Sequence, residues 1–91
     1  MVDLGAVTAG VPVEVIRQWL VSRVAFYLEL PESAVDPDAG LVEMGFDSVY
    51  ALTLSGDVED EFGLELEPTI AWDHRTVNAL AARVSAELAN R

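Results

Sequence analysis

The residues best placed for chemistry form the segment Gly45-Phe46-Asp47-Ser48-Val49, a glycine turn followed by an aspartate and a serine. The chain contains no cysteine, so any thiol chemistry in which it takes part has to use a covalently added group. Ser48 is the best-placed hydroxyl to receive such a group, because it follows a turn and precedes a predicted helix. The same arrangement is a common helix cap, so spacing alone leaves a structural and a functional role open.

A hydrolytic site would need a base and an acid beside this serine. His74 is the only histidine, and Asp73 or Asp47 would have to supply the acid. The adjacent Asp73 and His74 are poorly arranged for a base and its orienting carboxylate, and no G-x-S-x-G turn is present. We therefore expect no hydrolase activity and interpret His74 as a structural residue at a helix boundary.

A calcium loop is the second possibility, because Asp36, Asp38 and Asp47 occupy the first, third and twelfth positions of its template. Leu41 stands where the template requires glycine, and an aspartate replaces the bidentate glutamate. We expect solvated loop carboxylates here. Without a cluster of Cys or His, no transition-metal site is expected either.

The aromatic residues indicate packing rather than a cage for a ligand. Their helical spacing is typical of the core and its rim, and this interpretation applies to Trp19, Trp72, Phe26 and Phe62.

A long helix is expected early in the chain, followed by a long loop. Apolar residues recur at three- and four-residue steps behind a proline, which predicts a helix from about Pro12 to Leu28 that Pro31 stops. The segment from Glu29 to Asp47 has little periodicity, which predicts a functional or partly ordered loop. We expect Leu41 and Met44 to hold this loop to the core.

A second helix is predicted to begin at Asp47 or Ser48, whose side chains can cap its first turn, and to end near Phe62, with Gly63 as the stop. Its core side is expected to carry Ala51, Leu54, Val58 and Phe62. An apolar surface is expected on the opposite side, at Val49, Leu52 and Gly56, bordered by Glu59 and Asp60.

The remaining chain is expected to hold a connector and two helical pieces. Leu64-Glu65-Leu66-Glu67 alternates like a strand but is too short and isolated to build a sheet, so an extended connector is predicted. Pro68-Thr69 can open a short helical turn through Trp72, and Thr76 can cap a last helix. The inward residues of that helix are predicted to be Val77, Leu80, Ala81, Val84 and Leu88. The predicted fold is all-α, with three main helices and one short helix.

The 91 residues are enough for one domain with a modest core. We expect residues 1–11 to form a flexible N-terminal extension and residues 12–90 to form the domain. No apolar run is long enough to cross a bilayer, and the N-terminus lacks the pattern of an export signal. Together with the absence of cysteine, these features favour a cytoplasmic protein.

The charge is strongly acidic: 16 acidic and 5 basic residues give a formal net charge of −11. This charge repels the phosphates of nucleic acids and anionic lipid surfaces, so we expect neither as a partner. It would steer basic patches of protein partners toward the domain. It would also keep the domain soluble, and the composition alone does not separate these two roles.

From about Val13 to Leu88 the chain resembles the acyl carrier protein family. The modified serine of that family lies in a Gly-x-Asp-Ser-hydrophobic motif at the start of the second helix, matched here by Gly45 to Val49. The resemblance includes the approach Leu41-Val42-Glu43-Met44-Gly45 and the helix end Phe62-Gly63-Leu64. The run Trp72-Asp73-His74-Arg75-Thr76-Val77 is similar to the Phe-Asp-His-Pro-Thr pattern of polyketide synthase carriers, with Trp72 and Arg75 as departures outside the modification motif.

This resemblance implies a four-helix acyl-carrier bundle that is not itself an enzyme. Ser48 would be joined by a phosphodiester to 4′-phosphopantetheine, which a phosphopantetheinyl transferase donates from coenzyme A. Gly45 and Asp47 would belong to the same cofactor site, with Asp47 serving recognition and local structure. Acyl groups would be held as thioesters on the arm, which explains why the chain needs no cysteine. The start of a helix also favours the added negative phosphate.

The resemblance also implies the partner surface, because partner enzymes of this family commonly approach the second helix. The corresponding residues here are Val49, Leu52, Thr53, Gly56, Glu59 and Asp60. An apolar spot ringed by acid suits a basic enzyme surface with an apolar centre. The implied partners are a ketosynthase, an acyltransferase or an acyl-adenylating ligase, and other synthase domains, which would meet a monomeric carrier domain. The alternative is that Val49 and Leu52 pack under the long loop.

Three other interpretations stay open at this point. Peptidyl carriers usually show a second glycine, and often histidine, before the serine, where this chain has Phe46 and Asp47. The segment Leu54-Ser55-Gly56-Asp57-Val58-Glu59-Asp60 looks like carriers of fatty acyl starters that are loaded by acyl-adenylating ligases. A different class would be a small acidic interaction module without a prosthetic group.

Overall fold

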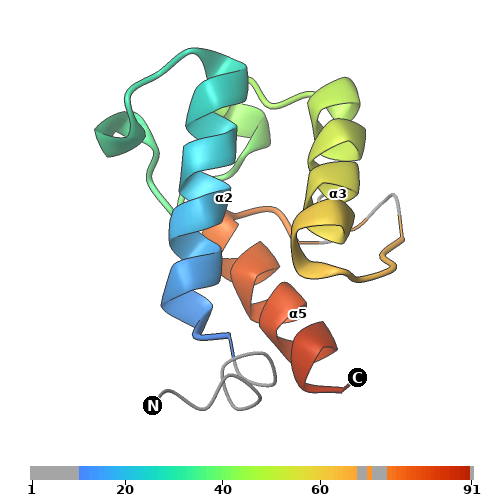
Figure 1. Ribbon diagram of the computed structural model, residues 1–91. Helices are drawn as coiled ribbons and strands as arrows, with labels where there is room; N and C mark the ends of the chain where they lie inside the picture. Colours follow the sequence, from blue (N-terminus) through green and yellow to red (C-terminus); the bar gives the residue numbers. More distant parts are fainter. Residues whose placement is uncertain (1–10, 68–69, 71–73, 91) are drawn as a thin grey trace.

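Three helices dominate the computed structural model, which describes residues 11–67, 70 and 74–90. They are α2 (Val13–Leu28), α3 (Ser48–Phe62) and α5 (Val77–Ala89). The helix α3 runs antiparallel to α2, and α5 packs beside the first half of α2 (Figure 1). Within the described ranges no strand is present, and the predicted all-α fold is confirmed.

The core lies between the inward sides of these three helices. Every inward residue predicted for α5 is buried, and so are Ala51, Leu54 and Val58 of α3. The largest fully buried side chains are Ile16, Leu20, Leu54, Leu80, Val24, Val58, Val77 and Val84. Each of them stabilises the fold by roughly 1.5–3 kcal/mol relative to an exposed position.

The helix α2 ends at Leu28 as predicted, but Pro31 is not the residue that ends it. Glu29 adopts the left-handed conformation, with φ 56°. The amide of Leu30 donates to the carbonyl of Ala25 at 3.0 Å, and the amide of Glu29 donates to that of Phe26 at 3.3 Å. This pattern satisfies the last carbonyls of a helix and usually employs glycine. The helix is therefore closed by its own backbone, two residues before the proline.

Two short 3₁₀ helices that the sequence pattern does not predict give the long loop its shape. They are η1 (Glu32–Ala34) and η2 (Val42–Met44). Leu41 is buried and Met44 packs against the core, as predicted for both. Val35 and Phe46 are buried as well, although neither was expected to hold the loop. The loop thus contributes to the core from Val35 to Phe46, whereas residues 29–34 are exposed.

Asn78, in the first turn of α5, connects the same loop to α5 and also bonds to α2. Its backbone amide donates to the carbonyl of Pro37 at 3.0 Å, and its side-chain nitrogen donates to Asp38. Its side-chain oxygen accepts from Arg17 of α2 at 2.6 Å. The amide of Leu41 adds a further bond to the carbonyl of Arg75 at 2.8 Å. These bonds fix the path by which the chain reaches α3.

The connector after α3, residues 64–67, forms neither a helix nor a strand. Gly63 ends α3 with φ 66°, and Leu64 is buried. The carboxylate of Glu59 accepts from the amide of Leu66 at 2.8 Å, which holds the connector against the helix. The predicted short helix from Pro68 to Trp72 lies outside the described residues, apart from Ile70, which is buried.

The packing interpretation is confirmed for Trp19 and Phe62, whose rings meet edge to face with centroids 5.2 Å apart. It is wrong for Phe26, which is 67% exposed. Phe26 lies on the outer side of α2, where the guanidinium of Arg23 stands 5.1 Å above its ring. Trp72 lies outside the described residues.

A polar cluster of three residues joins α2 to α3. Arg23 lies 3.1 Å from the carboxylate of Asp57, and the hydroxyl of Tyr27 donates to the same carboxylate. Burial of the Tyr27 phenol raises its pKa, and the hydrogen bond to Asp57 raises it further. The cluster therefore keeps its neutral phenol donor throughout the physiological pH range and stabilises the spacing of the two helices.

No helix in the described part of the chain has the length and apolar character needed to cross a membrane.

Candidate functional site

Ser48 is the first residue of α3, and it is exposed. The preceding residue, Asp47, is extended and caps the helix, because its carboxylate accepts from the amide of Tyr50 at 3.0 Å. The amide of Ala51 donates to the carbonyl of Asp47 at 3.0 Å and begins the helical ladder. The cap thus fixes the backbone on both sides of Ser48 at an exposed position.

The turn before the serine depends on the backbone of Gly45. This residue ends η2 with φ 98°, a conformation that residues with a side chain rarely adopt. A Cβ built at Gly45 would have no heavy atom within 4 Å, so strain rather than crowding makes glycine the suitable residue. The turn sends the chain from the loop directly into α3.

A cluster of three aromatic rings, those of Tyr27, Phe46 and Tyr50, packs next to the turn. Phe46 is buried, and its ring lies 6.4 Å from that of Tyr27 in α2 and 5.6 Å from that of Tyr50 in α3. The rings of Tyr27 and Tyr50 stack with centroids 5.7 Å apart. Because the cluster joins α2, the loop and α3, it holds the start of α3 in place.

A shallow hollow of about 390 Å³ opens beside the serine. We call it the loop-side hollow; it is lined by Val42, Gly45, Phe46, Asp47 and Ser48. Of these lining residues, Val42 is 50% exposed and Phe46 is buried. Ser48 therefore stands at the border of an apolar depression.

The start of α3 suits a negatively charged group on Ser48. The first amides of a helix have no partner within the helix, and the helix dipole places positive potential at this end. Asp47 engages the amide of Tyr50, so those of Ser48 and Val49 precede the helical ladder. A phosphodiester on the serine oxygen would lie next to these amides, so the residues present fit a phosphate-linked group.

Replacing the cap at Asp47 is expected to lower stability without changing the fold. Asp47→Ala removes the acceptor of the Tyr50 amide, which corresponds to a loss of about 1 kcal/mol in the free energy of unfolding. Asp47→Asn keeps an acceptor and is expected to stay close to the original protein. Urea denaturation followed by far-ultraviolet circular dichroism measures both. An asparagine variant as unstable as the alanine variant would show that the charge, rather than the cap, matters.

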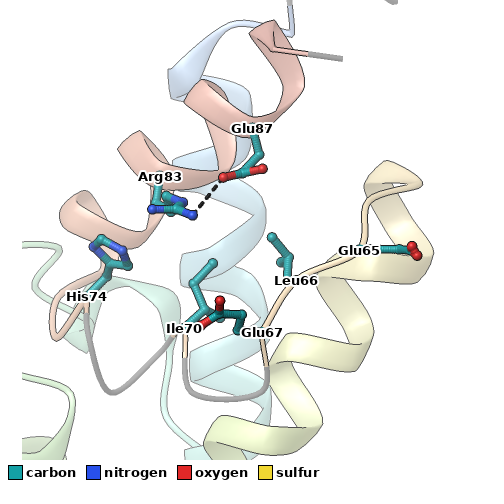
Figure 2. Close-up of a pocket in the computed structure, with 7 residues that line it drawn as sticks. All are labelled: Glu65, Leu66, Glu67, Ile70, His74, Arg83 and Glu87. Atoms are coloured by element: carbon teal, nitrogen blue, oxygen red, sulfur yellow. Dashed lines mark ion pairs between the residues drawn. The ribbon is translucent and has the colours of Figure 1, made fainter.

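His74 lies in a different hollow from Ser48. It faces a cavity of about 360 Å³ between the connector and α5, together with Ile70, Arg83 and Glu87 (Figure 2). The guanidinium of Arg83 pairs with the carboxylate of Glu87 at 2.7 Å. Asp73 lies outside the described residues, and Asp47 caps α3. The structure therefore does not bring His74 and Ser48 together as a base and its nucleophile.

The three aspartates of the calcium template have separate contacts. Asp36 accepts from the backbone amide of Asp38 at 2.9 Å, and Asp38 accepts from Asn78. Asp47 accepts from Tyr50. Each carboxylate thus shapes the loop or a helix end, and among the described residues no group of three or more His, Cys, Asp or Glu could hold a metal ion.

The solvent-facing side of α3, which we call the outer face, carries the predicted partner residues Val49, Leu52, Thr53, Gly56, Glu59 and Asp60. Val49 is 66% exposed and Leu52 is 55% exposed, so the alternative that they pack under the loop is wrong. Gly56 has open space around the position of a Cβ. Glu59 differs from the others, because its carboxylate holds the connector through the amide of Leu66.

Two residues beside the serine were not singled out from the sequence. Phe46 directly precedes the helix cap, a position at which apolar residues often pack against the first turn, and this signal could have indicated its burial. Val42 had no such signal, because its exposure follows from the path of η2.

A small helical domain that presents one serine at the exposed start of a helix, beside an apolar hollow, defines a class of protein that carries an attached group. The family described as "phosphopantetheine attachment site" matches residues 18–84. The chain belongs to this family of domains, which carry covalently attached 4′-phosphopantetheine and are generally non-catalytic.

Similar proteins include large synthases. One of the subunits of the phenolphthiocerol/phthiocerol polyketide synthase of Mycobacterium tuberculosis is 35% identical over 71 residues, which cover 78% of this chain and 4% of that protein. The 5-methyl-1-naphthoate synthase of Streptomyces sahachiroi is 36% identical over 87 residues, which cover 96% of this chain and 5% of that protein. The chain thus spans a small fraction of the length of these curated relatives.

Solved carrier structures share the fold. A free-standing peptidyl carrier protein from a secondary metabolic pathway of Acinetobacter baumannii has a TM-score of 0.81 and 39% identity, covering 84% of this chain and 95% of that one. The HMG-ACPI domain from the CurA module of Lyngbya majuscula has a TM-score of 0.81 and 25% identity, covering 89% of this chain and 82% of that one.

Proposed function

We propose that the chain is an acyl carrier domain of a polyketide pathway that bears 4′-phosphopantetheine on Ser48. The observation that carries this proposal is the exposed Ser48 at the capped first turn of α3, within the segment that the carrier family matches. The curated relatives named as polyketide synthases support the assignment to that kind of pathway.

The modification requires Ser48 to act as a nucleophile in the active site of a separate phosphopantetheinyl transferase. The serine oxygen forms a bond to the phosphorus next to the pantetheine of coenzyme A, and the bond from that phosphorus to the other phosphate of coenzyme A breaks. The serine proton passes to the transferase or its solvent. Because the carboxylate of Asp47 is engaged with the amide of Tyr50, its role is to position the serine rather than to accept this proton.

The rest of the domain holds the modified serine in place and is not itself chemically altered during acyl transfer. The bound arm supplies the thiol on which acyl groups are held as thioesters. Asp47 and Gly45 fix the backbone around Ser48, and with it the direction in which the serine side chain leaves the backbone. The aromatic cluster keeps this direction constant while different enzymes act on the cargo. Coenzyme A and such synthases act in the cytoplasm, where we place this domain.

The outer face of α3 is proposed to receive the transferase, a ketosynthase, an acyltransferase and other synthase domains. Val49 and Leu52 provide exposed apolar area next to Ser48, and Asp60 provides an exposed carboxylate farther along the helix. With a net charge of −11, the domain would be drawn to basic enzyme surfaces, and the apolar pair would contribute contact area. The carboxylate of Glu59 is less available to a partner, because it already accepts a hydrogen bond from the connector.

A peptidyl cargo is the second candidate. One observation favours it: the peptidyl carrier protein from Acinetobacter baumannii shares 39% of its residues with this chain over nearly its whole length. Loading assays with an amino-acid-activating and an acyl-transferring partner would separate the two cargo classes. A fatty acyl starter supplied by an acyl-adenylating ligase is a variant of the first proposal and would be found in the same assays.

The proposal is tested by incubating the protein with coenzyme A, magnesium and a broad-specificity phosphopantetheinyl transferase. We expect the intact mass to rise by one phosphopantetheine arm, and peptide fragmentation to locate the arm on Ser48. A protein that stays unmodified while a known carrier in the same reaction is converted would contradict the proposal and favour the acidic interaction module.

Replacing Leu52 with glutamate is expected to slow acyl loading of the modified domain by about ten-fold or more, because it places a charge at the apolar centre of the proposed contact. The exposed position makes a change of fold unexpected. Val15→Glu is the matched control: Val15 is 54% exposed, close to the 55% of Leu52, but it lies in the first turn of α2. Equal loading rates for the two variants would argue against a contact at Leu52.

A further inference from the structure

Ser48 has apolar surface on two different sides. On one side lies the loop-side hollow, with the half-exposed Val42 at its edge. On the other side lies the outer face of α3, with Val49 and Leu52. Neither Val49 nor Leu52 lines the loop-side hollow, so the two surfaces are distinct. An arm on Ser48 therefore has two places to rest, only one of which coincides with the proposed partner surface.

We propose that the loop-side hollow is the resting site of the arm between enzymes, and that the outer face stays clear for docking. This inference rests on the proposed function, because it needs an arm on Ser48. The part of the arm that the hollow would take is the segment after the phosphate, which carries two methyl groups on a quaternary carbon. These methyl groups would lie against the side chain of Val42 and the edge of Phe46.

Tethering is the first argument for this resting site. Ser48 itself lines the hollow, so the first segment of the arm is held next to Val42 and Phe46 at a high effective concentration. Even a weak apolar contact is then populated, since association of two separate molecules is not required. The arm stays readily removable, because the hollow is shallow and its apolar area is small.

The shape and rigidity of the hollow are the second argument. One of its lining residues, Phe46, is 3% exposed, and the ring of Phe46 is held by Tyr27 and Tyr50. Gly45, which also lines the hollow, has no side chain to fill it. The hollow therefore exists before the arm arrives and does not have to be opened. An exposed valine at its edge would bury part of its apolar surface when the arm lies over it.

The charge pattern favours the same side. The phosphate is attracted to the first amides of α3, which start next to Gly45 and Asp47. Asp47 itself lies at the border of the hollow, and its carboxylate is turned to the amide of Tyr50. The phosphate is thus held at the end of α3 that borders the hollow, whereas on the outer face the exposed carboxylate of Asp60 adds like charge beyond Leu52.

Nuclear magnetic resonance of the modified protein tests this inference. The protein is labelled with ¹³C in the valine methyl groups, converted with unlabelled coenzyme A, and checked by intact mass for one arm per chain. We expect nuclear Overhauser effects between the methyl groups of the arm and those of Val42. We also expect amide shifts of Gly45 and Phe46 to differ between the modified and unmodified forms more than those of Leu52 and Gly56.

Two matched variants complete the test. Val42→Thr keeps the size of the side chain but makes it polar, so we expect the shift differences at Gly45 and Phe46 to fall by about two-fold or more. Val49→Thr makes the same change on the outer face and is expected to leave them unaltered.

Contacts of the arm with Val49 or Leu52, or equal effects of the two threonine variants, would overturn the inference, as would an arm without contacts. In each of these cases the mass still shows the arm, so the proposed function stands. A protein without any gain in mass would instead contradict the proposed function itself.

Discussion

Replacing Ser48 with alanine is expected to leave the protein entirely without an arm in the transferase reaction that converts the original protein. Alanine removes the exposed serine hydroxyl at the capped start of α3, and the chain has no cysteine that could take its place. The fold is expected to persist, because position 48 is exposed and alanine is a good helix former. Intact mass measures the modification, and far-ultraviolet circular dichroism measures the helix content.

Ser33 offers a matched control for this prediction. It is an exposed serine in η1, within the same loop, and Ser33→Ala is expected to be modified as fully as the original protein. An arm that still forms on the Ser48→Ala protein would place the attachment at another hydroxyl. That result would also remove the basis for the proposed resting site in the loop-side hollow.

Replacing Leu54 with alanine is expected to lower the free energy of unfolding by about 2–5 kcal/mol, the largest stability effect that we predict. Leu54 is fully buried on the core side of α3, so the shorter side chain loses apolar contacts and leaves a cavity. Native domains have a total stability of only about 5–15 kcal/mol, so this loss is a large fraction of it. Thermal and urea denaturation measure the change.

Leu52 provides the control for the cavity, because it is a leucine on the same helix that is 55% exposed. Leu52→Ala is expected to change the free energy of unfolding by less than about 0.5 kcal/mol. Similar losses for the two variants would mean that Leu52 is packed in solution. In that case the outer face of α3 would not be available to partner enzymes in the form described above.

Both ends of α3 and the start of α5 were predictable because they depend on residues close together in the chain. Asp47 and Thr76 each accept a hydrogen bond from an amide three residues later, and Gly63 takes the left-handed conformation. These are local preferences of the residue types. The start of α3, and with it the position of Ser48, therefore followed from the sequence alone.

The packing of the loop was not predictable because it depends on residues far apart in the chain. Asn78 bonds to Asp38 and to Arg17, 40 and 61 positions away, and no local pattern indicates such contacts. Phe26 was placed in the core because its spacing is helical, but which side of α2 is covered depends on where α3 lies. The conformation of Glu29 was not predicted either, because the left-handed conformation at a helix end is one that sequence rules assign to glycine.

The aromatic cluster of Tyr27, Phe46 and Tyr50 has a consequence for how far a cargo can travel. Because it clamps the loop and both neighbouring helices at the attachment end, the domain contributes no hinge of its own there. The radius over which an acyl group sweeps is then set by the rotatable bonds of the pantetheine alone. Two catalysts separated by more than that radius can share this carrier only if the whole domain migrates between them as a single piece.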